Sequence, residues 1–308
     1  MKMTKWIDPL FKAGTGALAW LFVALSALLL MILVEAALPS IRAFGWSFLW
    51  TSHWDAVRDQ FGALPIIYGT LVSALVALLI AVPLSLGIAL YLAELGPLWI
   101  REPLNMLIEL LAAIPSVIYG LWGLLVLVPL LRDSVEPFLS KYFGFLPFFQ
   151  GPAYGVGMLA AGIILSIMII PTISSISREV FTTVSNSQKE GALALGATRW
   201  EMVRMAILPA SRTGVLGAVL LGLGRALGET MAVTMVIGNR PDISLSLFNP
   251  SYTMAALIAN EFTEATTPIH TSALMEVGLV LLAITLLLNI FARMLVMSMT
   301  QKTGSKKS

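Results

Sequence analysis

The chain has 308 residues, of which 58% are hydrophobic and only 12% are charged, and its mean hydropathy is +0.89. A soluble domain carries about a quarter charged residues, so a chain of this composition needs lipid around much of its surface. The net charge of +2 gives no indication of a nucleic-acid partner, and we predict none; the absence of cysteine excludes disulfides and thiolate metal sites.

Six apolar segments are long enough to cross a bilayer as helices. A hydrocarbon core of about 30 Å requires about 20 residues per helix, since each residue rises about 1.5 Å. The candidate spans cover residues 13–34, 65–93, 110–131, 154–177, 213–237 and 273–297. Every backbone polar group must pair internally in a membrane, so we expect these segments to be helical. Pro83, Pro115 and Pro171 are expected to kink or end their helices.

The N-terminal segment combines lysines with the first apolar run. Lys2, Lys5 and Lys12 are typical of the start of a secretory signal peptide, and small residues follow the run near residues 34–40. The run is, however, longer than a signal-peptide core of about 7–15 residues. We therefore predict an uncleaved first helix.

The distribution of Lys and Arg orients the predicted spans. With an even number of spans both termini share one side of the membrane, and cytoplasmic loops carry an excess of positive charge. Cytoplasmic termini place thirteen Lys and Arg inside: Lys2, Lys5, Lys12, Arg101, Arg178, Lys189, Arg199, Arg204, Arg212, Arg293, Lys302, Lys306 and Lys307. Five lie outside: Arg42, Arg58, Arg132, Lys141 and Arg240. We predict that both termini are cytoplasmic.

The predicted external segments, residues 39–64, 132–153 and 238–272, contain aromatic and turn residues. Trp46, Trp50 and Trp54 recur every four residues, which predicts one face of a short helix along the membrane interface. We interpret this face as an aromatic belt, with a docking surface for an external partner as the alternative. His53 and His270 have no second ligand at metal spacing, and we expect both to be ordinary loop histidines.

The predicted cytoplasmic segment 178–212 is long enough for two short helices, with Gly196 as the break between them. Ser187 with Glu190, and Thr198 with Glu201, have the spacing of a capping box and mark the two helix starts. The second helix is expected over residues 198–208, with an apolar stripe, and to end at Pro209. Such a pair of helices is either a surface feature or a socket for another protein.

The same segment carries the first resemblance to a known family. Glu190-Gly191-Ala192, then Gly196, then Ile207-Leu208-Pro209 resemble the EAA loop of ABC-importer permeases, whose coupling helices dock on the ATP-hydrolysing subunit. Gly191 replaces the usual first alanine, and Ala206 stands where a β-branched residue is common. The resemblance implies that Glu190, Gly191, Ala192, Gly196 and Pro209 belong to an ATPase-coupling loop. A glycine turn would let a short rigid helix protrude and pass on nucleotide-driven motion.

No nucleotide site is recognisable in the chain itself. It contains no Gly-Lys dipeptide, which a phosphate-binding P-loop requires. We therefore predict a transport subunit that is not an enzyme and binds no cofactor, with ATP and Mg used by a separate ATPase docked on residues 185–212.

The fifth predicted span contains charges inside the membrane. Within residues 223–233 (LGRALGETMAV), Arg225 and Glu229 are the only charges well inside any predicted span. Each costs about 2.5–3.5 kcal/mol at a helix centre, so such residues are rarely without function. Their i,i+4 spacing predicts one helix face and an ion pair. One interpretation is that the pair fixes helix packing. The other is that Arg225 lines the substrate pathway and offers its guanidinium to an oxyanion, while Glu229 holds the guanidinium in place.

A narrower resemblance rests on two longer motifs. Residues 225–233 (RALGETMAV) and 113–123 (AIPSVIYGLWG) are similar to signatures of the phosphate-importer permeases of the bacterial Pst system. Residues 259–262 (ANEF) and the MAV ending resemble its C-type subunit. The resemblance covers about residues 60–300. It implies an all-α, type I ABC-importer permease in the bacterial inner membrane, with an N-terminal segment 1–59, a transmembrane domain 60–300 and a basic tail 301–308.

The resemblance also implies the partners. They are a homologous second permease, two ATPase subunits, a periplasmic phosphate-binding protein and the lipid bilayer. The residues leave other functions open, because one Arg and one Glu do not distinguish phosphate from sulfate, molybdate or phosphonate. An ATP-independent secondary transporter or channel would lack the internal repeat common in that class. A membrane-embedded enzyme would lack the usual catalytic motifs.

Overall fold

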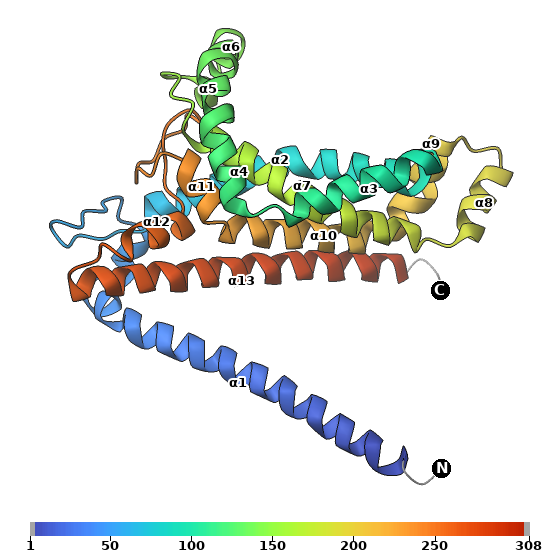
Figure 1. The fold of residues 1–308 in the computed structure, drawn as a ribbon, viewed down its shortest axis with the longest axis horizontal. Helices are drawn as coiled ribbons and strands as arrows, with labels where there is room; N and C mark the ends of the chain where they lie inside the picture. Colours follow the sequence, from blue (N-terminus) through green and yellow to red (C-terminus); the bar gives the residue numbers. More distant parts are fainter. Residues whose placement is uncertain (1–3, 305–308) are drawn as a thin grey trace.

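The computed structural model describes residues 4–304, which are mostly helical (Figure 1). Six helical segments are long and apolar enough to cross a membrane. They are Phe11–Leu49, Leu64–Leu95, Ser116–Phe143, Met158–Thr182, Arg199–Gly228 and Pro268–Met294. The predicted all-α membrane protein with about six transmembrane helices is confirmed.

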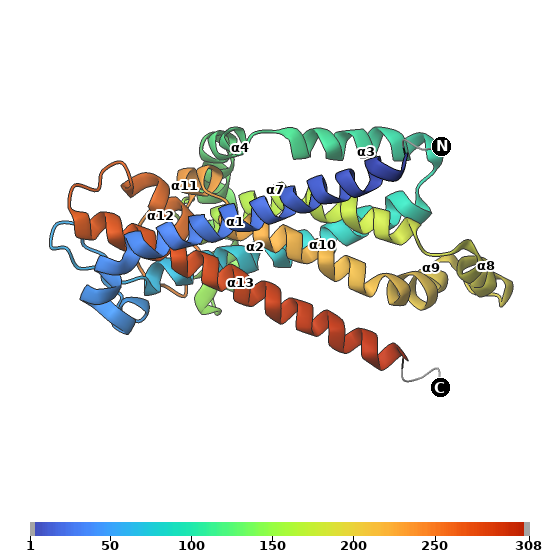
Figure 2. The same ribbon diagram turned by 90° about the horizontal axis from the view of Figure 1, so that it is seen from below.

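The long helices run side by side and define one long axis. The helices are α1 (Thr4–Phe44), α2 (Leu64–Leu90), α3 (Leu98–Ala113), α4 (Ser116–Trp122), α5 (Val128–Leu130), α6 (Glu136–Phe143), α7 (Met158–Thr182), α8 (Asn186–Ala194), α9 (Arg199–Met202), α10 (Leu208–Gly228), α11 (Met231–Val236), α12 (Met254–Glu261) and α13 (Pro268–Gly304). Helix α7 contacts α2, α3 and α10, while α1 contacts α13 and diverges from it toward its N-terminal end (Figures 1 and 2).

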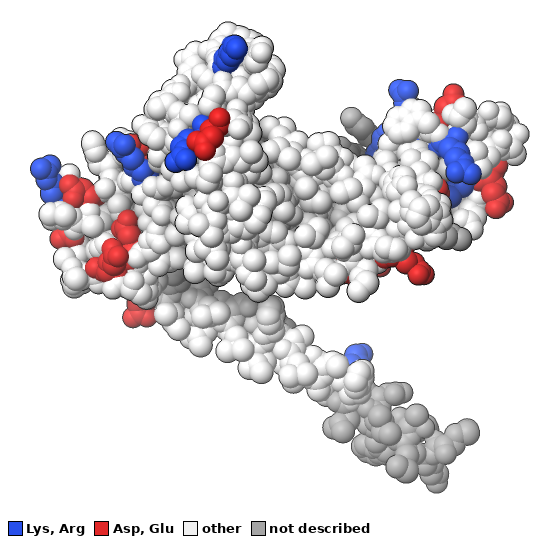
Figure 3. Space-filling view, turned by 45° about the horizontal axis from the view of Figure 1, so that its top comes forward, with Lys and Arg blue, Asp and Glu red and all other residues white. Residues whose placement is uncertain are grey.

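Charged side chains gather at the two ends of this axis, and the band between them is nearly free of charge (Figure 3). The start of α1, the end of α13 and the short helices α8 and α9 lie toward one end (Figure 1). Long helices with apolar surfaces between two charged ends are the arrangement that a bilayer requires.

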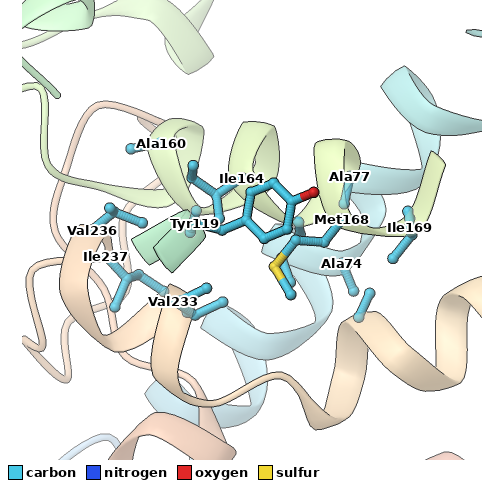
Figure 4. Packing of buried hydrophobic residues seen from close by; sticks show 14 of the residues in the cluster. Ala74, Ala77, Tyr119, Ala160, Ile164, Met168, Ile169, Val233, Val236 and Ile237 are labelled. Atoms are coloured by element: carbon cyan, nitrogen blue, oxygen red, sulfur yellow. The ribbon is translucent and has the colours of Figure 1, made fainter. Parts of the chain in front are cut away.

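The buried core is built around α7. Ile164 and Met168 of α7 lie in one cluster with Ala77 of α2, Tyr119 of α4 and Val233 of α11 (Figure 4). The cluster also contains alanines of α2 and α7, such as Ala77 and Ala161. Small residues of this kind let helix backbones approach closely, which provides much of the packing energy between helices in lipid. This core joins α2, α4, α7 and α11.

The third predicted span, residues 110–131, straddles a break in the structure. Helix α3 ends at Ala113, and a new helix starts at Ser116 after an extended Ile114 and Pro115. A proline disfavours helical geometry in the residue before it, so Pro115 ends α3 as expected. The following segment continues to Phe143 through π-helical turns at Gly123–Leu127 and Leu131–Val135, and it turns away from the direction of α13 (Figure 1).

Two features of the external segments differ from the prediction. Trp46 lies in a 3₁₀ turn with 83% of its surface exposed, whereas Trp54 lies beyond the turn and donates its Nε1 hydrogen to Glu261 Oε2 at 2.8 Å. The three tryptophans therefore do not form one helix face. His270 is not a loop residue, because it lies buried in the first turn of α13.

Candidate coupling loop and substrate pathway

The predicted coupling loop is a hairpin of α8 and α9. Gly196 has a φ of +86°, in the left-handed region that glycine adopts without strain. Its N–H donates to the carbonyl of Leu193 at 3.0 Å, and the N–H of Ala197 donates to that of Ala192 at 3.2 Å. These two bonds form a Schellman motif, which satisfies the last carbonyls of α8. The predicted break at Gly196 is thus present.

The two predicted helix starts have different outcomes. Thr198 and Glu201 form a full capping box: Thr198 Oγ1 accepts the Glu201 N–H at 3.3 Å, and Glu201 Oε2 accepts the Thr198 N–H at 2.8 Å. The predicted cap at Ser187 is wrong, because α8 already starts at Asn186, with Ser185 in the N-cap position. Ser187 lies inside the first turn.

Pro209 does not end the second helix. The helix is continuous from Arg199 to Gly228, with a π-helical turn at Val203–Ile207 directly before the Leu208-Pro209 pair. A proline has no N–H and clashes with the preceding turn of a regular helix. The wider π turn accommodates this, so α9 and α10 form one rod from the coupling loop into the membrane.

One side of the hairpin packs on the ends of α2 and α7. Ala192 is partly buried against a cluster of Ala89, Ala93, Phe181, Val184, Met202, Val203 and Ile207. Lys189 Nζ donates to Glu94 Oε1 at 2.6 Å, and both side chains are largely buried, with 14% and 13% of their surface exposed. No local sequence pattern predicts this ion pair, since the two residues lie 95 positions apart.

The other side of the hairpin is open. Glu190 is exposed, Leu195 is 91% exposed, and Trp200 and Met205 are also exposed. They lie toward a charged end of the molecule (Figures 1 and 3). An exposed apolar patch in water usually marks a protein contact. The structure thus brings Glu190, Gly191, Ala192 and Gly196 into one hairpin, whereas Pro209 lies further along on the exposed side of α10.

Arg225 and Glu229 are separated by a helix break. Helix α10 ends at Gly228, Glu229 has an extended backbone with φ −72° and ψ 128°, and α11 begins at Met231. The predicted continuous fifth span is therefore wrong, and so is the predicted ion pair. Glu229 Oε1 instead accepts the N–H of Ala232 at 3.4 Å, within the first turn of α11. This bond satisfies one amide that the helix start leaves free.

Arg225 lies half-buried against α7. Its Nη1 donates to Thr172 Oγ1 at 3.1 Å, which is a neutral partner. No carboxylate forms an ion pair with Arg225 in the described part of the chain. A guanidinium has five N–H donors in a planar fork, so donors are left for an oxyanion, which it binds bidentately.

Thr172 is expected to orient Arg225. In a Thr172→Val variant the shape is kept but the acceptor is lost, and a hydrogen bond to a charged group contributes about 1.5–3 kcal/mol. We expect substrate transport to fall by about tenfold or more, since 1.4 kcal/mol corresponds to tenfold. Thr182→Val, on the exposed end of the same helix, is the matched control. Equal transport rates in the two variants would contradict a role for Thr172.

A polar pocket lies among the external segments. It has a volume of about 660 Å³ and is lined by His53, Trp54, Asp55, Ala56, Asn239, Pro241, Tyr252, Asn260, Glu261 and Glu264. Glu261 Oε2 contacts His270 Nε2 at 3.0 Å, and Asn260 Nδ2 donates to the Tyr252 hydroxyl at 2.9 Å. Burial raises the pKa of Tyr252 to about 12, so its hydroxyl stays protonated at neutral pH. No motif or spacing in the sequence predicts this pocket.

Comparison with known proteins places the chain in a family. The profile of the binding-protein-dependent transport system inner membrane component matches residues 82–301, which include the coupling loop and Arg225. The chain belongs to this family. The resemblance to ABC-importer permeases inferred from residues 190–209 is thereby confirmed, and the chain is a transport permease that crosses the membrane several times.

Relatives of this permease match it over nearly their whole length. A phosphate transport system permease protein PstC from Haemophilus influenzae is 50% identical over 303 residues, which cover 97% of this chain and 96% of the relative. A protein of the same name from Pasteurella multocida is 47% identical over 97% of this chain and 95% of its own. A probable phosphate transport system permease protein PstC from Methanocaldococcus jannaschii is 38% identical, and the match covers 94% of this chain and 93% of the relative.

Solved structures with the same fold are ABC transporters. A bacterial alginate ABC transporter in complex with a pentasaccharide-bound periplasmic protein aligns over 94% of both chains, with a TM-score of 0.60 and 16% identity. The MetNI methionine ABC transporter in an inward-facing conformation aligns over 79% of this permease and 95% of its own chain, with a TM-score of 0.52 and 16% identity. At this identity the likeness concerns the fold alone.

Proposed function

We propose that this permease is the C-type subunit of an ATP-driven importer of inorganic phosphate. The observation that carries the proposal is the near-full-length identity, 47–50%, to phosphate transport permeases of two bacteria. The chemistry of the pathway supports it. A half-buried Arg225 with open donors suits an oxyanion, because arginine stays charged and binds phosphate through its planar fork.

The proposed assembly follows from what the two ends of the molecule offer. A homologous second permease would complete the pathway, one of two ATPase subunits would dock on the α8–α9 hairpin, and a periplasmic phosphate-binding protein would deliver the substrate. The hairpin lies toward the same end as the start of α1 and the end of α13 (Figure 1). Both termini would then be cytoplasmic, in the inner membrane of a bacterium, in agreement with the excess of Lys and Arg on that side.

The division of labour within the chain belongs to the proposal. Residues 60–300 would form the transmembrane domain, preceded by the N-terminal segment 1–59 and followed by the tail 301–308. The permease would bind no nucleotide, and ATP with Mg would be used by the partner ATPase. Closure of the ATPase pair would push the hairpin, and the rod of α9 and α10 would pass the displacement toward Arg225.

Uptake of labelled phosphate tests the proposal. The permease would be reconstituted in vesicles with its partner permease, ATPase and binding protein, and an excess of sulfate or molybdate would be added as competitor. We expect uptake that requires ATP and resists both competitors. Displacement by sulfate or molybdate would assign another oxyanion, and uptake without ATP would indicate a secondary transporter.

A further inference from the structure

Helix α8 has few attachments to the membrane part of the permease. Short turns join it to α7 and α9, and Ala192 packs on the buried cluster at the ends of α2 and α7. It also packs on the π turn Val203–Ile207 of the α9–α10 rod, and its attachment to the turn after α2 is the ion pair of Lys189 with Glu94. An element that an ATPase moves can displace the membrane helices only through such attachments.

The Lys189–Glu94 pair differs from the other Lys and Arg ion pairs of the described residues. Arg58–Asp55, Arg132–Asp133 and Arg240–Asp242 each join residues of one loop or turn, and at least 39% of each side chain is exposed. Exposed pairs of this kind contribute about 0–1 kcal/mol. Lys189 and Glu94, in contrast, join two separate elements at 2.6 Å and are largely shielded from water. Removal of one partner would leave a buried charge unpaired, so the two elements are expected to move together.

Glu94 is part of the turn between α2 and α3. It lies in the π-helical turn Tyr91–Leu95, which ends α2 and leads through Gly96 and Pro97 into α3. The Gly96 N–H donates to the Tyr91 carbonyl at 2.6 Å, and Arg101 Nε donates to the Gly96 carbonyl at 2.7 Å. These bonds close the turn from both sides. A displacement of Glu94 is therefore expected to carry the first turn of α3 with it.

Helix α3 leads from this turn to the proposed pathway. The Tyr119 hydroxyl of α4 donates to the Leu111 carbonyl of α3 at 2.8 Å, across the break at Pro115. Gly120 of α4 then packs on α11, where an added Cβ would lie 2.9 Å from the Cα of Ala232. Ala232 in turn donates its N–H to Glu229. Direct contacts thus connect α8 with the helix break that follows Arg225.

We propose that Lys189 and Glu94 are a positioning pair, which transmits the displacement of α8 to the α2–α3 turn and from there to the break at Glu229. The pair acts through α3 and does not contact substrate or ATPase. This inference rests on the proposed function, because it concerns how ATP use is coupled to transport.

The test compares transport with ATP use in the complete reconstituted complex. Lys189→Met and Glu94→Gln each remove one charge, and the double variant Lys189→Glu with Glu94→Lys exchanges them. We expect ATP hydrolysis stimulated by the binding protein to stay within about twofold of the native rate, because Glu190 and the exposed side of the hairpin are unchanged. Phosphate taken up per ATP should fall at least about fivefold in the single variants and recover in the exchanged pair. Arg132→Met, in an exposed pair, is the control.

Three outcomes would overturn the inference. They are a native ratio of uptake to ATP in the single variants, no recovery in the exchanged pair, or an equal loss of both activities, which would indicate a role in folding or docking.

A second measurement does not depend on the transported anion. Amide hydrogen exchange at residues 96–101 would be compared between the nucleotide-free complex and the complex trapped with ATP and vanadate. We expect trapping to change the exchange in the native complex but not in Lys189→Met. If the native complex takes up no phosphate yet shows this difference, the proposed substrate fails and the positioning pair stands. If trapping changes nothing at the turn, or changes it equally in Lys189→Met, the positioning pair is refuted.

Discussion

An Arg225→Ala variant is expected to lose ATP-driven phosphate uptake by about 100-fold or more, while the complex still assembles. Arg225 is the only Lys or Arg in residues 213–237. In the described part of the chain, no acidic side chain forms an ion pair with it. Loss of charge-assisted bonds to an oxyanion costs about 1.5–3 kcal/mol, which corresponds to between tenfold and about 150-fold. Because Arg225 is half-buried and donates to Thr172, alanine also removes packing against α7.

Two further variants separate charge from geometry. Arg225→Lys keeps the charge but loses the planar fork, so we expect an intermediate uptake. Arg212→Ala, on the exposed first turns of the same helix, is the matched control and should transport at the native rate. The three variants are compared by their initial rates of phosphate uptake, measured with equal amounts of purified complex. A native rate of uptake in Arg225→Ala would contradict a role of Arg225 in the substrate pathway. Arg225 would then serve helix packing alone.

The coupling loop was largely predictable from the sequence because its signals are local. A glycine between two polar, capped segments predicts a left-handed turn, and the structure has that turn at Gly196. The capping box of Thr198 and Glu201 depends on residues three positions apart, and both of its bonds are present. The cap at Ser187 was misplaced, since Ser185 fits the same local pattern two residues earlier.

The substrate pathway was less predictable, because it depends on contacts between distant segments. The expected pairing of Arg225 with Glu229 assumes a continuous helix, and hydropathy gives no sign that α10 ends at Gly228. The break follows from packing: α11 lies against α4, where Gly120 allows the backbone of Ala232 to approach. Glu94 and Lys189 are likewise brought together only by the fold. Composition therefore predicts how many helices cross the membrane, while tertiary contacts decide where they break.

A Gly196→Pro variant is expected to lose both uptake and the stimulation of ATP hydrolysis by the binding protein. Proline fixes φ near −65°, whereas Gly196 has a φ of +86° and needs its N–H for the bond to Leu193. The hairpin of α8 and α9 cannot form with that residue, so the surface proposed to meet the ATPase is lost. The Gly196→Ala variant keeps the N–H and is expected to be milder, because a left-handed residue with a Cβ costs about 1–2 kcal/mol.

The chain contains its own control for this experiment five residues earlier. Gly191 lies in the middle of α8, and a Cβ added there would have no atom within 4 Å. Alanine stabilises a helix relative to glycine by up to about 1 kcal/mol, so Gly191→Ala should transport at least as well as the native permease.

Uptake and ATP hydrolysis, measured in the same vesicles, distinguish a lost hairpin from a broken ion pair. A lost hairpin abolishes both activities, whereas a broken Lys189–Glu94 pair leaves hydrolysis and lowers uptake per ATP. Native activities in Gly196→Pro would mean that the hairpin is not the coupling element, whatever its resemblance to one.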